Sequence, residues 1–281
     1  MNVMELVSET NIAERLNQEE LDKIGREVVE GYKNDKQSRS KWEHQVKGYY
    51  ELALQVAKEK SFPWPKASNI KFPLISTAAM QFGARAYPTL VPANGKIVQI
   101  KVFGADPENQ KAARARRIAS HMNYQLLVEM DEWEEDQDKL LLMLPIVGTA
   151  FKKTYYDASR KRNKSCLVFP QNLVVNYWTK SLEESYRITE VIFLNKNEIK
   201  EKKTRKVYLD ADIGEPTIEV ELNEERRDQE PNVVDGATPY KILEQHTYLD
   251  LDDDGYFEPY IITVDLHSEK VLRIVARFKE E

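Results

Sequence analysis

The chain of 281 residues has a single cysteine, few glycines and none of the short motifs that mark the common catalytic sites. Cys166 can form no disulfide within the chain, which favours a reducing compartment, and its apolar strand-like setting predicts a structural thiol. No G-x-S-x-G, G-x-x-x-x-G-K-[ST] or G-x-G-x-x-G is present. The four histidines are scattered without the spacing of a metal-binding pair. These absences give no support for an enzyme or for an organic cofactor.

The chain also lacks a positive charge excess and a long apolar run. Its net charge is −6, whereas proteins that cling to nucleic-acid phosphates carry a strong basic excess. The longest apolar run, 140–151, contains Pro145 and Gly148 and is well short of the roughly 20 apolar residues that a bilayer-spanning helix needs. The acidic N-terminal stretch has no signal-peptide core. We therefore predict a soluble protein with no membrane partner.

What the sequence does contain is helical periodicity in the first half and short β-branched or aromatic segments in the second. The pattern predicts a first helix capped by Asn17 and Glu20, a polar link at 33–40 and a second helix from Trp42 to Val56. It then predicts a third helix at 74–87, a strand at 96–103 and one long helix at 107–144 with Asp106 as its N-cap. Beyond Gly148 it predicts strands at 149–156, 165–169, 173–177, 187–193, 206–209, 217–222, 240–251, 259–266 and 270–278, a helix at 197–206 and a loop at 223–239. The predicted class is α+β, with long N-terminal helices followed by an antiparallel β part. The expected segments are a helical one at 1–60, a proline-rich one with the long helix at 61–148, and a β-rich one at 149–281.

The least generic stretch is residues 61–92, where Trp64 lies between Pro63 and Pro65. The two prolines forbid a helix and make the segment rigid. A rigid aromatic segment serves either as a core wedge or as a contact surface between subunits, and the residues themselves leave both open.

Two groups of charged residues are candidate sites on the predicted long helix. Arg114 and Arg117 are three residues apart and share a face, which allows either surface ion pairs or contact with DNA phosphate or an acidic neighbouring subunit. The carboxylates between 129 and 138 are typical of a solvated helix face. A hydrolase that uses these acidic residues is a third, weaker alternative.

A final candidate is LDLDDDGYFEP at 249–259, in which three aspartates alternate before a glycine. Counted from Asp250 as position 1 of a helix–loop–helix calcium loop, Asp252, Asp254 and Glu258 fall at ligand positions 3, 5 and 9. The bidentate glutamate of position 12 is missing, because Ile261 stands there, and the flanks read as strands. We therefore predict a β-hairpin, with Asp250, Asp252, Asp254 and Glu258 at its acidic tip as a weak candidate site for a cation such as Ca²⁺. An alternative function is a calcium-binding interaction module centred on 250–258.

The proline-rich stretch also carries a resemblance. FPWPKASNIKFPLISTAAMQFGARAYPTLVP resembles the N-terminal signature of the portal proteins of short-tailed double-stranded DNA bacteriophages. The likeness continues in 113–157, which resembles the long wing helix and the strand after it, in the β segment 169–199 and in the hairpin 250–278. It covers nearly all of the chain from about Ser61.

This resemblance implies a virion structural protein without catalysis of its own. Portals form a dodecameric ring at one capsid vertex, through which DNA enters and leaves, and the ring docks the terminase motor and the tail adaptor. The resemblance implies as partners further copies of the chain, capsid protein, terminase, tail adaptor and translocating DNA, with assembly in the bacterial host cytoplasm. Members of the family continue past the last hairpin into a stem, a clip and a crown. The chain therefore corresponds to the wing, with Pro63, Trp64, Pro65, Arg114 and Arg117 as candidate interaction residues.

Overall fold

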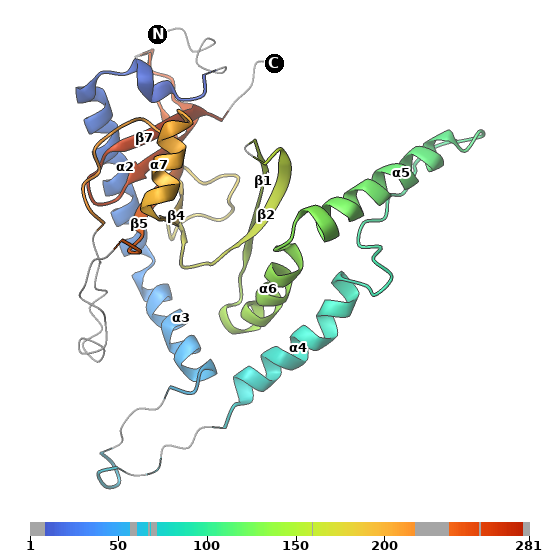
Figure 1. Cartoon of the computed structure of the whole chain (residues 1–281). Helices are drawn as coiled ribbons and strands as arrows, with labels where there is room; N and C mark the ends of the chain where they lie inside the picture. Colours follow the sequence, from blue (N-terminus) through green and yellow to red (C-terminus); the bar gives the residue numbers. More distant parts are fainter. Residues whose placement is uncertain are drawn as a thin grey trace. The chain divides into compact units, whose positions relative to one another are not determined.

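The computed structural model describes residues 9–56, 61–66, 68, 72–158, 160–216, 236–252 and 254–277. Helices precede a set of antiparallel strands along the chain (Figure 1), and the predicted α+β class is confirmed. The described residues form two compact units. One combines the residues up to Ser40 with those from Gln171 onward, and the other is Lys41–Pro170. The first helix of the sequence therefore belongs with the strands at the end of the chain.

The first unit is built on a five-stranded sheet in which every neighbouring pair is antiparallel. Its strands follow in chain order: β3 (Leu173–Val175), β4 (Ile188–Leu194), β5 (Tyr240–Leu249), β6 (Glu258–Asp265) and β7 (Val271–Ala276). These confirm five predicted strands. The strand predicted at 206–209 is wrong, because the backbone there makes a turn after a helix and only the Leu209 amide bonds to β7, at Leu272 (2.7 Å). The strand predicted at 217–222 and most of the loop at 223–239 lie outside the described residues.

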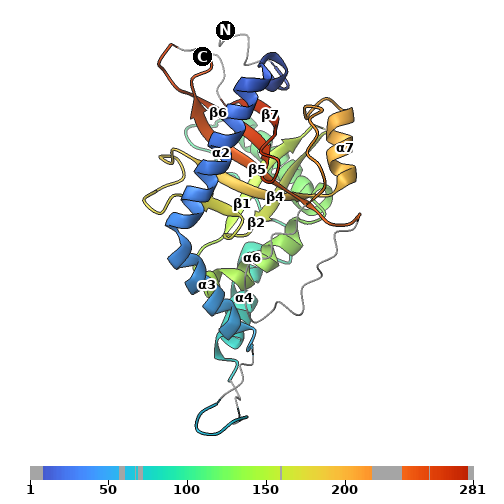
Figure 2. The same ribbon diagram turned by 90° about the vertical axis from the view of Figure 1, so that its left-hand side faces the viewer.

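Helix α2 (Gln18–Ser38) lies across one face of this sheet (Figure 2). Its predicted capping box is confirmed: the Asn17 side chain accepts from the Glu20 amide and the Glu20 carboxylate accepts from the Asn17 amide, both at 2.9 Å. The apolar stripe of the helix packs on alternate residues of β6. The residues of this core include Leu21, Ile24, Val28, Tyr32, Leu243, Tyr260, Ile262 and Val264. The polar link predicted at 33–40 is wrong, because Asp35 is buried and bonded within the unit and the helix continues to Ser38.

The opposite face of the sheet is covered by α7 (Lys196–Thr204) and the segment after it. Ile199, Tyr208 and Ile213 form a second core with Ile242 and Leu272. Because Leu243 points to the α2 core and Ile242 to this one, β5 is buried on both sides. The helix predicted at 197–206 is confirmed and begins with its own capping box, Asn195 and Glu198.

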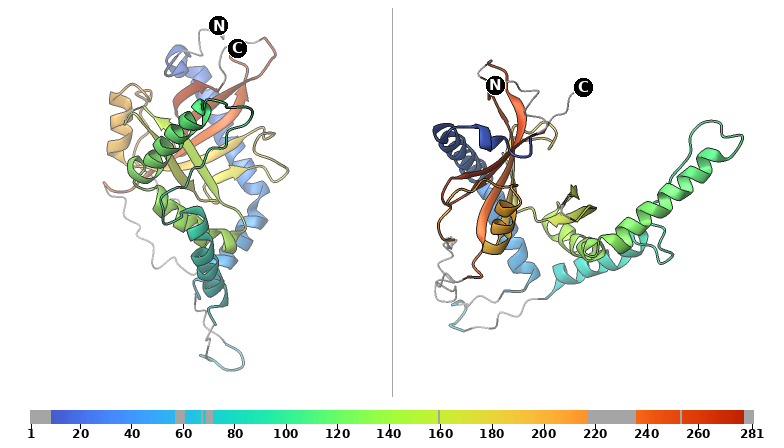
Figure 3. Two further views of the ribbon diagram at one scale, coloured as in Figure 1. Left: turned by 90° about the vertical axis from the view of Figure 1, so that its right-hand side faces the viewer. Right: turned by 45° about the horizontal axis from the view of Figure 1, so that its top comes forward.

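The second unit contains most of four helices and a two-stranded hairpin (Figure 3). Its elements are α3 (Ser40–Ala53), α4 (Leu74–Leu90), α5 (Gln110–Tyr124), a π-helical turn η2 (Gln125–Glu129), α6 (Trp133–Val147), β1 (Phe151–Asp157) and β2 (Arg162–Val168). Helix α4 packs along α6 and continues through Pro88, where the sequence predicted its end. The core is small: Val46, Met143 and Val147 are buried, with partly buried side chains around them.

The single long helix predicted at 107–144 is wrong, because the chain leaves helical geometry at Met130 (φ −99°, ψ 76°) and starts again at Trp133. Strand β2 explains the break. Arg162 donates to the Glu129 carbonyl and lies 3.6 Å from the Asp131 carboxylate, so part of the acidic run is paired rather than only solvated. Asp106 accepts from the amides of residues 111 and 112 as an N-terminal acceptor should, although the helix begins at Gln110.

The strand predicted at 96–103 does not form. This segment instead lies against α5, where the Asn123 side chain both donates to and accepts from the backbone of Val98 (3.2 and 2.8 Å). A lone extended segment has no ladder to join, so one side-chain amide takes the place of a neighbouring strand. None of the helices in the described part of the chain is both long and apolar enough to cross a lipid bilayer.

Candidate functional site

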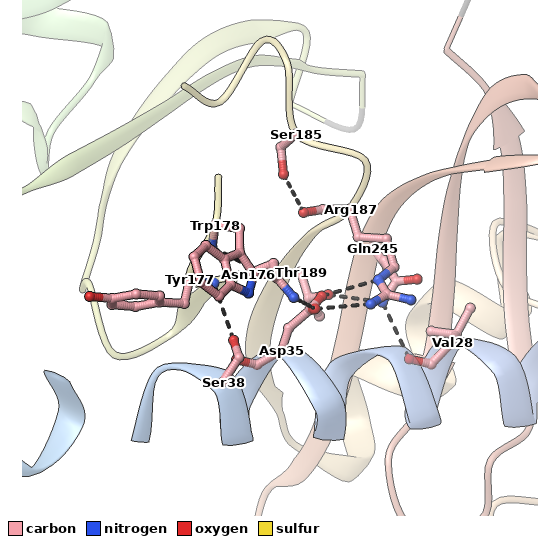
Figure 4. Close-up of polar contacts among 10 residues, drawn as sticks. All are labelled: Val28, Asp35, Ser38, Asn176, Tyr177, Trp178, Ser185, Arg187, Thr189 and Gln245. Carbon is pink, nitrogen blue, oxygen red and sulfur yellow. Dashed lines mark hydrogen bonds and ion pairs between the residues drawn. The ribbon is translucent and has the colours of Figure 1, made fainter. Parts of the chain in front are cut away.

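The most densely bonded polar group of the first unit is centred on Asp35 (Figure 4). The Asp35 side chain is fully buried near the C-terminal end of α2. Arg187, just before β4, donates from Nη2 to Oδ1 at 2.9 Å and from Nε to Oδ2 at 3.1 Å. Asn176, just after β3, donates from Nδ2 to Oδ1 at 2.9 Å. Two-point binding by arginine fixes direction as well as charge, so this contact positions the β3–β4 connection on the helix.

Further hydrogen bonds extend the group in both directions. The Ser38 hydroxyl donates to the Asp35 carbonyl (2.7 Å) and accepts from the Tyr177 amide (3.1 Å). On the sheet side, the buried Gln245 donates to the Val28 carbonyl (3.3 Å) and to the Thr189 hydroxyl. Carboxylate and guanidinium neutralise each other, and the group holds no nucleophile poised next to a base. Its role is therefore to fix the geometry of the segment 176–186, between β3 and β4.

That segment presents aromatic side chains to solvent. Trp178 is 84% exposed and meets Tyr177 edge to face, with ring centroids 5.8 Å apart. Tyr186 stacks on Tyr248 of β5 at 5.6 Å. Rigidly held exposed aromatic rings are common at protein interfaces, because they bury a large area at little entropic cost.

The predicted interaction residues of the proline-rich segment are all exposed. Trp64 is 65% exposed, and its neighbours Pro63 and Pro65 are exposed as well. Trp64 is therefore not a core residue among the residues that the structure describes, and the contact surface stays a prediction.

Arg114 and Arg117 both lie on α5 and are exposed. Neither makes an ion pair within the described residues, so the surface ion pairs that were one alternative do not form there. Near them, α5 and residues 95–102 enclose an open groove of about 520 Å³, lined by small and apolar side chains together with Lys96, Gln99, Arg116 and Asn123.

The acidic tip at 250–258 joins β5 to β6, so the predicted hairpin is confirmed. The aspartates fold the turn themselves. Asp250 accepts the amides of Asp254 (3.3 Å) and Gly255 (2.9 Å), and Asp254 accepts the Tyr256 amide (2.7 Å). Gly255 has φ +89°, which a glycine adopts without strain. One carboxylate oxygen each of Asp250, Asp252 and Asp254 lies within 4.8 Å of the others.

Glu258 is the most unusual acid of this tip. It is the first residue of β6, opposite Leu249, and only 8% exposed. Burial raises the pKa of its carboxyl, and the charges of Asp252, Asp254 and Asp250 raise it further. The pKa of the Tyr260 phenol is also raised, first by burial and then by Glu258.

Reasoning from the sequence brought together Asp250, Asp252 and Asp254, which the structure also groups, but it missed the Asp35 group. A signal was present, because Asp35 continues the helical stripe of Leu21, Ile24, Val28 and Tyr32, where a charge needs a buried partner. Its partners, 141 and 152 residues further along, have no such signal. No protein-family model matches the sequence, and no curated protein matches it significantly, so its function is inferred from the residues themselves.

Proposed function

We propose that this chain is a structural subunit of a bacteriophage portal ring, corresponding to the wing region, and that it acts by packing against further copies of itself. The observation that carries the proposal is the poor burial of the second unit, residues 41–170. Its buried hydrophobic side chains are few and mostly small: Val46, Ala53, Ala79, Ala115, Leu141, Met143, Val147 and Val168. By contrast, most of the exposed large hydrophobic side chains of the described chain belong to this unit.

The exposed side chains include large aromatic residues. Phe62, Trp64, Phe72 and Phe103 are each at least 65% exposed. Burying one such side chain contributes roughly 1.5–3 kcal/mol, so leaving all of them in water forgoes a large favourable term. Exposed apolar surface on this scale is typical of protein–protein interfaces rather than of monomers.

The resemblance indicates that the partner is the same chain. In a closed ring each subunit binds its neighbour through two different surfaces, so a subunit carries apolar area on more than one element. Exposed apolar residues occur here on the 61–72 segment, on α4 and on α5. The net charge of −6 agrees with a channel that DNA passes without sticking. In this role the chain is no enzyme, its further partners are capsid protein, terminase and tail adaptor, and it belongs to the virion.

The test is the state of association of the full chain. We expect size-exclusion chromatography with light scattering to show concentration-dependent oligomers, and electron microscopy to show closed rings. Trp64→Ala should raise the dissociation constant of the oligomer at least tenfold. It should not lower the melting temperature, since Trp64 contributes to no core in the described residues.

The matched control is Phe193→Ala, which removes an aromatic ring that is 52% exposed on the other unit. It should leave association unchanged. A wild-type chain that stays monomeric at all concentrations, or a discrete two-fold dimer in place of rings, would contradict the proposal. If Phe193→Ala weakened association as much as Trp64→Ala, only the role given to the Pro-Trp-Pro segment would be contradicted.

A further inference from the structure

The hairpin between β5 and β6 gathers negative charge without a compensating positive group. Asp250, Asp252, Asp254 and Glu258 lie within nine residues of chain, and none of them forms an ion pair within the described residues. Elsewhere in the same unit, Asp35 pairs with Arg187, Asp22 pairs with Lys270, and the buried Asp265 accepts hydrogen bonds from Ser268. The tip is therefore an exception in its own surroundings.

Glu258 supplies an observation that is independent of the aspartates. Its side chain is more than nine-tenths buried, and its Oε2 atom has no hydrogen-bond partner. Glu258 begins β6 directly after the turn that the aspartates form, opposite Leu249 at the end of β5. Oδ1 of Asp252 is likewise buried without a partner. A buried carboxylate oxygen without a hydrogen-bond donor is a strong reason to expect a ligand. Without a partner, the oxygen loses its hydration and gains no interaction in return, so the full desolvation cost remains.

We propose that Asp250, Asp252, Asp254 and Glu258 form a calcium site that ties the end of β5 to the start of β6. The oxygens of the three aspartates, within 4.8 Å of one another, fit around one ion, since opposite oxygens of a calcium site lie about 4.6–5.2 Å apart. All donors are carboxylates, and the site is asymmetric. Calcium accepts such irregular oxygen sets, whereas magnesium requires a near-ideal octahedron and keeps much of its water.

The site differs from a helix–loop–helix calcium loop in how it uses its ligands. Position 12 of that loop is Ile261, which follows Glu258 on the other face of β6 and cannot contribute. Glu258 instead stands at the start of β6, where it is buried, while Asp250 directly follows the end of β5. Because the ligands span the connection from the end of β5 to the start of β6, binding would hold the hairpin closed and fix Tyr256 and Phe257, which are exposed at its tip. This role is independent of ring assembly.

The experiment titrates the full chain, freed of metal with a chelator, with calcium chloride by calorimetry and repeats the melting curve with calcium or magnesium. We expect one calcium ion per chain and a melting temperature that rises with calcium concentration, as binding to the folded state alone requires. Asp252→Asn and Glu258→Gln should each weaken calcium binding at least tenfold. Without metal, Glu258→Gln should melt no lower than the wild type, because it removes an unsatisfied charge.

The control is Asp212→Asn. Asp212 also caps a glycine turn, accepting the Gly214 amide at 3.0 Å, but it lies outside the acidic tip. It should bind calcium as the wild type does. The proposal is overturned if the wild type shows neither heat of binding nor a melting shift at millimolar calcium, if Asp252→Asn binds as tightly as the wild type, or if magnesium gives the same affinity.

Discussion

Removing Arg187 from the Asp35–Arg187 pair should destabilise the first unit more strongly than removing the charge of Asp35. Asp35 is fully buried, whereas the Arg187 side chain is 28% exposed. In Arg187→Met the carboxylate keeps only the Asn176 amide and stays in the core without a counter-charge. In Asp35→Asn the guanidinium can still turn towards water, and the new amide can still accept a hydrogen bond.

The magnitudes follow from these two situations. Removing one partner of a buried ion pair costs about 3–5 kcal/mol, because the remaining charge is uncompensated. Losing a hydrogen-bonded group whose partner can reach solvent costs about 1–3 kcal/mol. We therefore expect Arg187→Met to lower the free energy of unfolding by about 3–5 kcal/mol and Asp35→Asn by about 1–2 kcal/mol. The double variant should cost less than the sum, with a coupling of about 1–3 kcal/mol.

Hydrogen exchange of the β5 and β6 amides measures this loss within the first unit alone, and urea denaturation of the full chain measures it overall. The matched control is Lys196→Met, which breaks the exposed pair with Glu215 (3.4 Å) and should cost less than about 1 kcal/mol. The reasoning is refuted if Arg187→Met costs less than about 1 kcal/mol, or if Asp35→Asn is the more damaging of the two.

Two further predictions concern α2 of the first unit, with Gly48 of the second unit as a control, and both are measured by urea denaturation of the full chain. Gly25→Ala should destabilise the protein by about 1–3 kcal/mol despite the gain in helix propensity, because a Cβ there would lie 2.0 Å from the backbone oxygen of Glu269. Gly48→Ala, where a Cβ would meet nothing within 4 Å, should stabilise it by roughly 0.5–1 kcal/mol. Equal effects of the two substitutions would disprove the close approach at Gly25. The hydrogen bond from Lys270 (2.7 Å) is the main cause that lowers the pKa of Asp22, so its stabilisation is present above the ordinary carboxyl pKa and is lost as the pH falls through the lowered value. The stability gap between wild type and Asp22→Asn, followed by urea denaturation, should therefore shrink between about pH 6 and about pH 3, and a gap that stays constant would count against it.

Local signals in the sequence were sufficient where the deciding interactions are local. The capping box at Asn17 and the turn at Gly255 depend on residues within a few positions, and both form as predicted. Two of the failures involve a distant partner. The break at Met130 depends on Arg162, and the segment around Val98 stays out of any strand because Asn123 satisfies its backbone. Neither partner can be identified from spacing along the chain.

The two units differ in how they complete their cores, and this difference separates the two proposals. The sheet of the first unit is covered on both faces, by α2 and by α7, so its stability depends on its own residues. In the second unit, whose core centres on Val46, Met143 and Val147, the proposed neighbouring subunits would add further burial. Binding to neighbours stabilises a unit by mass action, whereas calcium would act on the hairpin of the first unit at any protein concentration. Raising the concentration should therefore protect amides of α4 and α5 from hydrogen exchange, and calcium should protect those of β5 and β6.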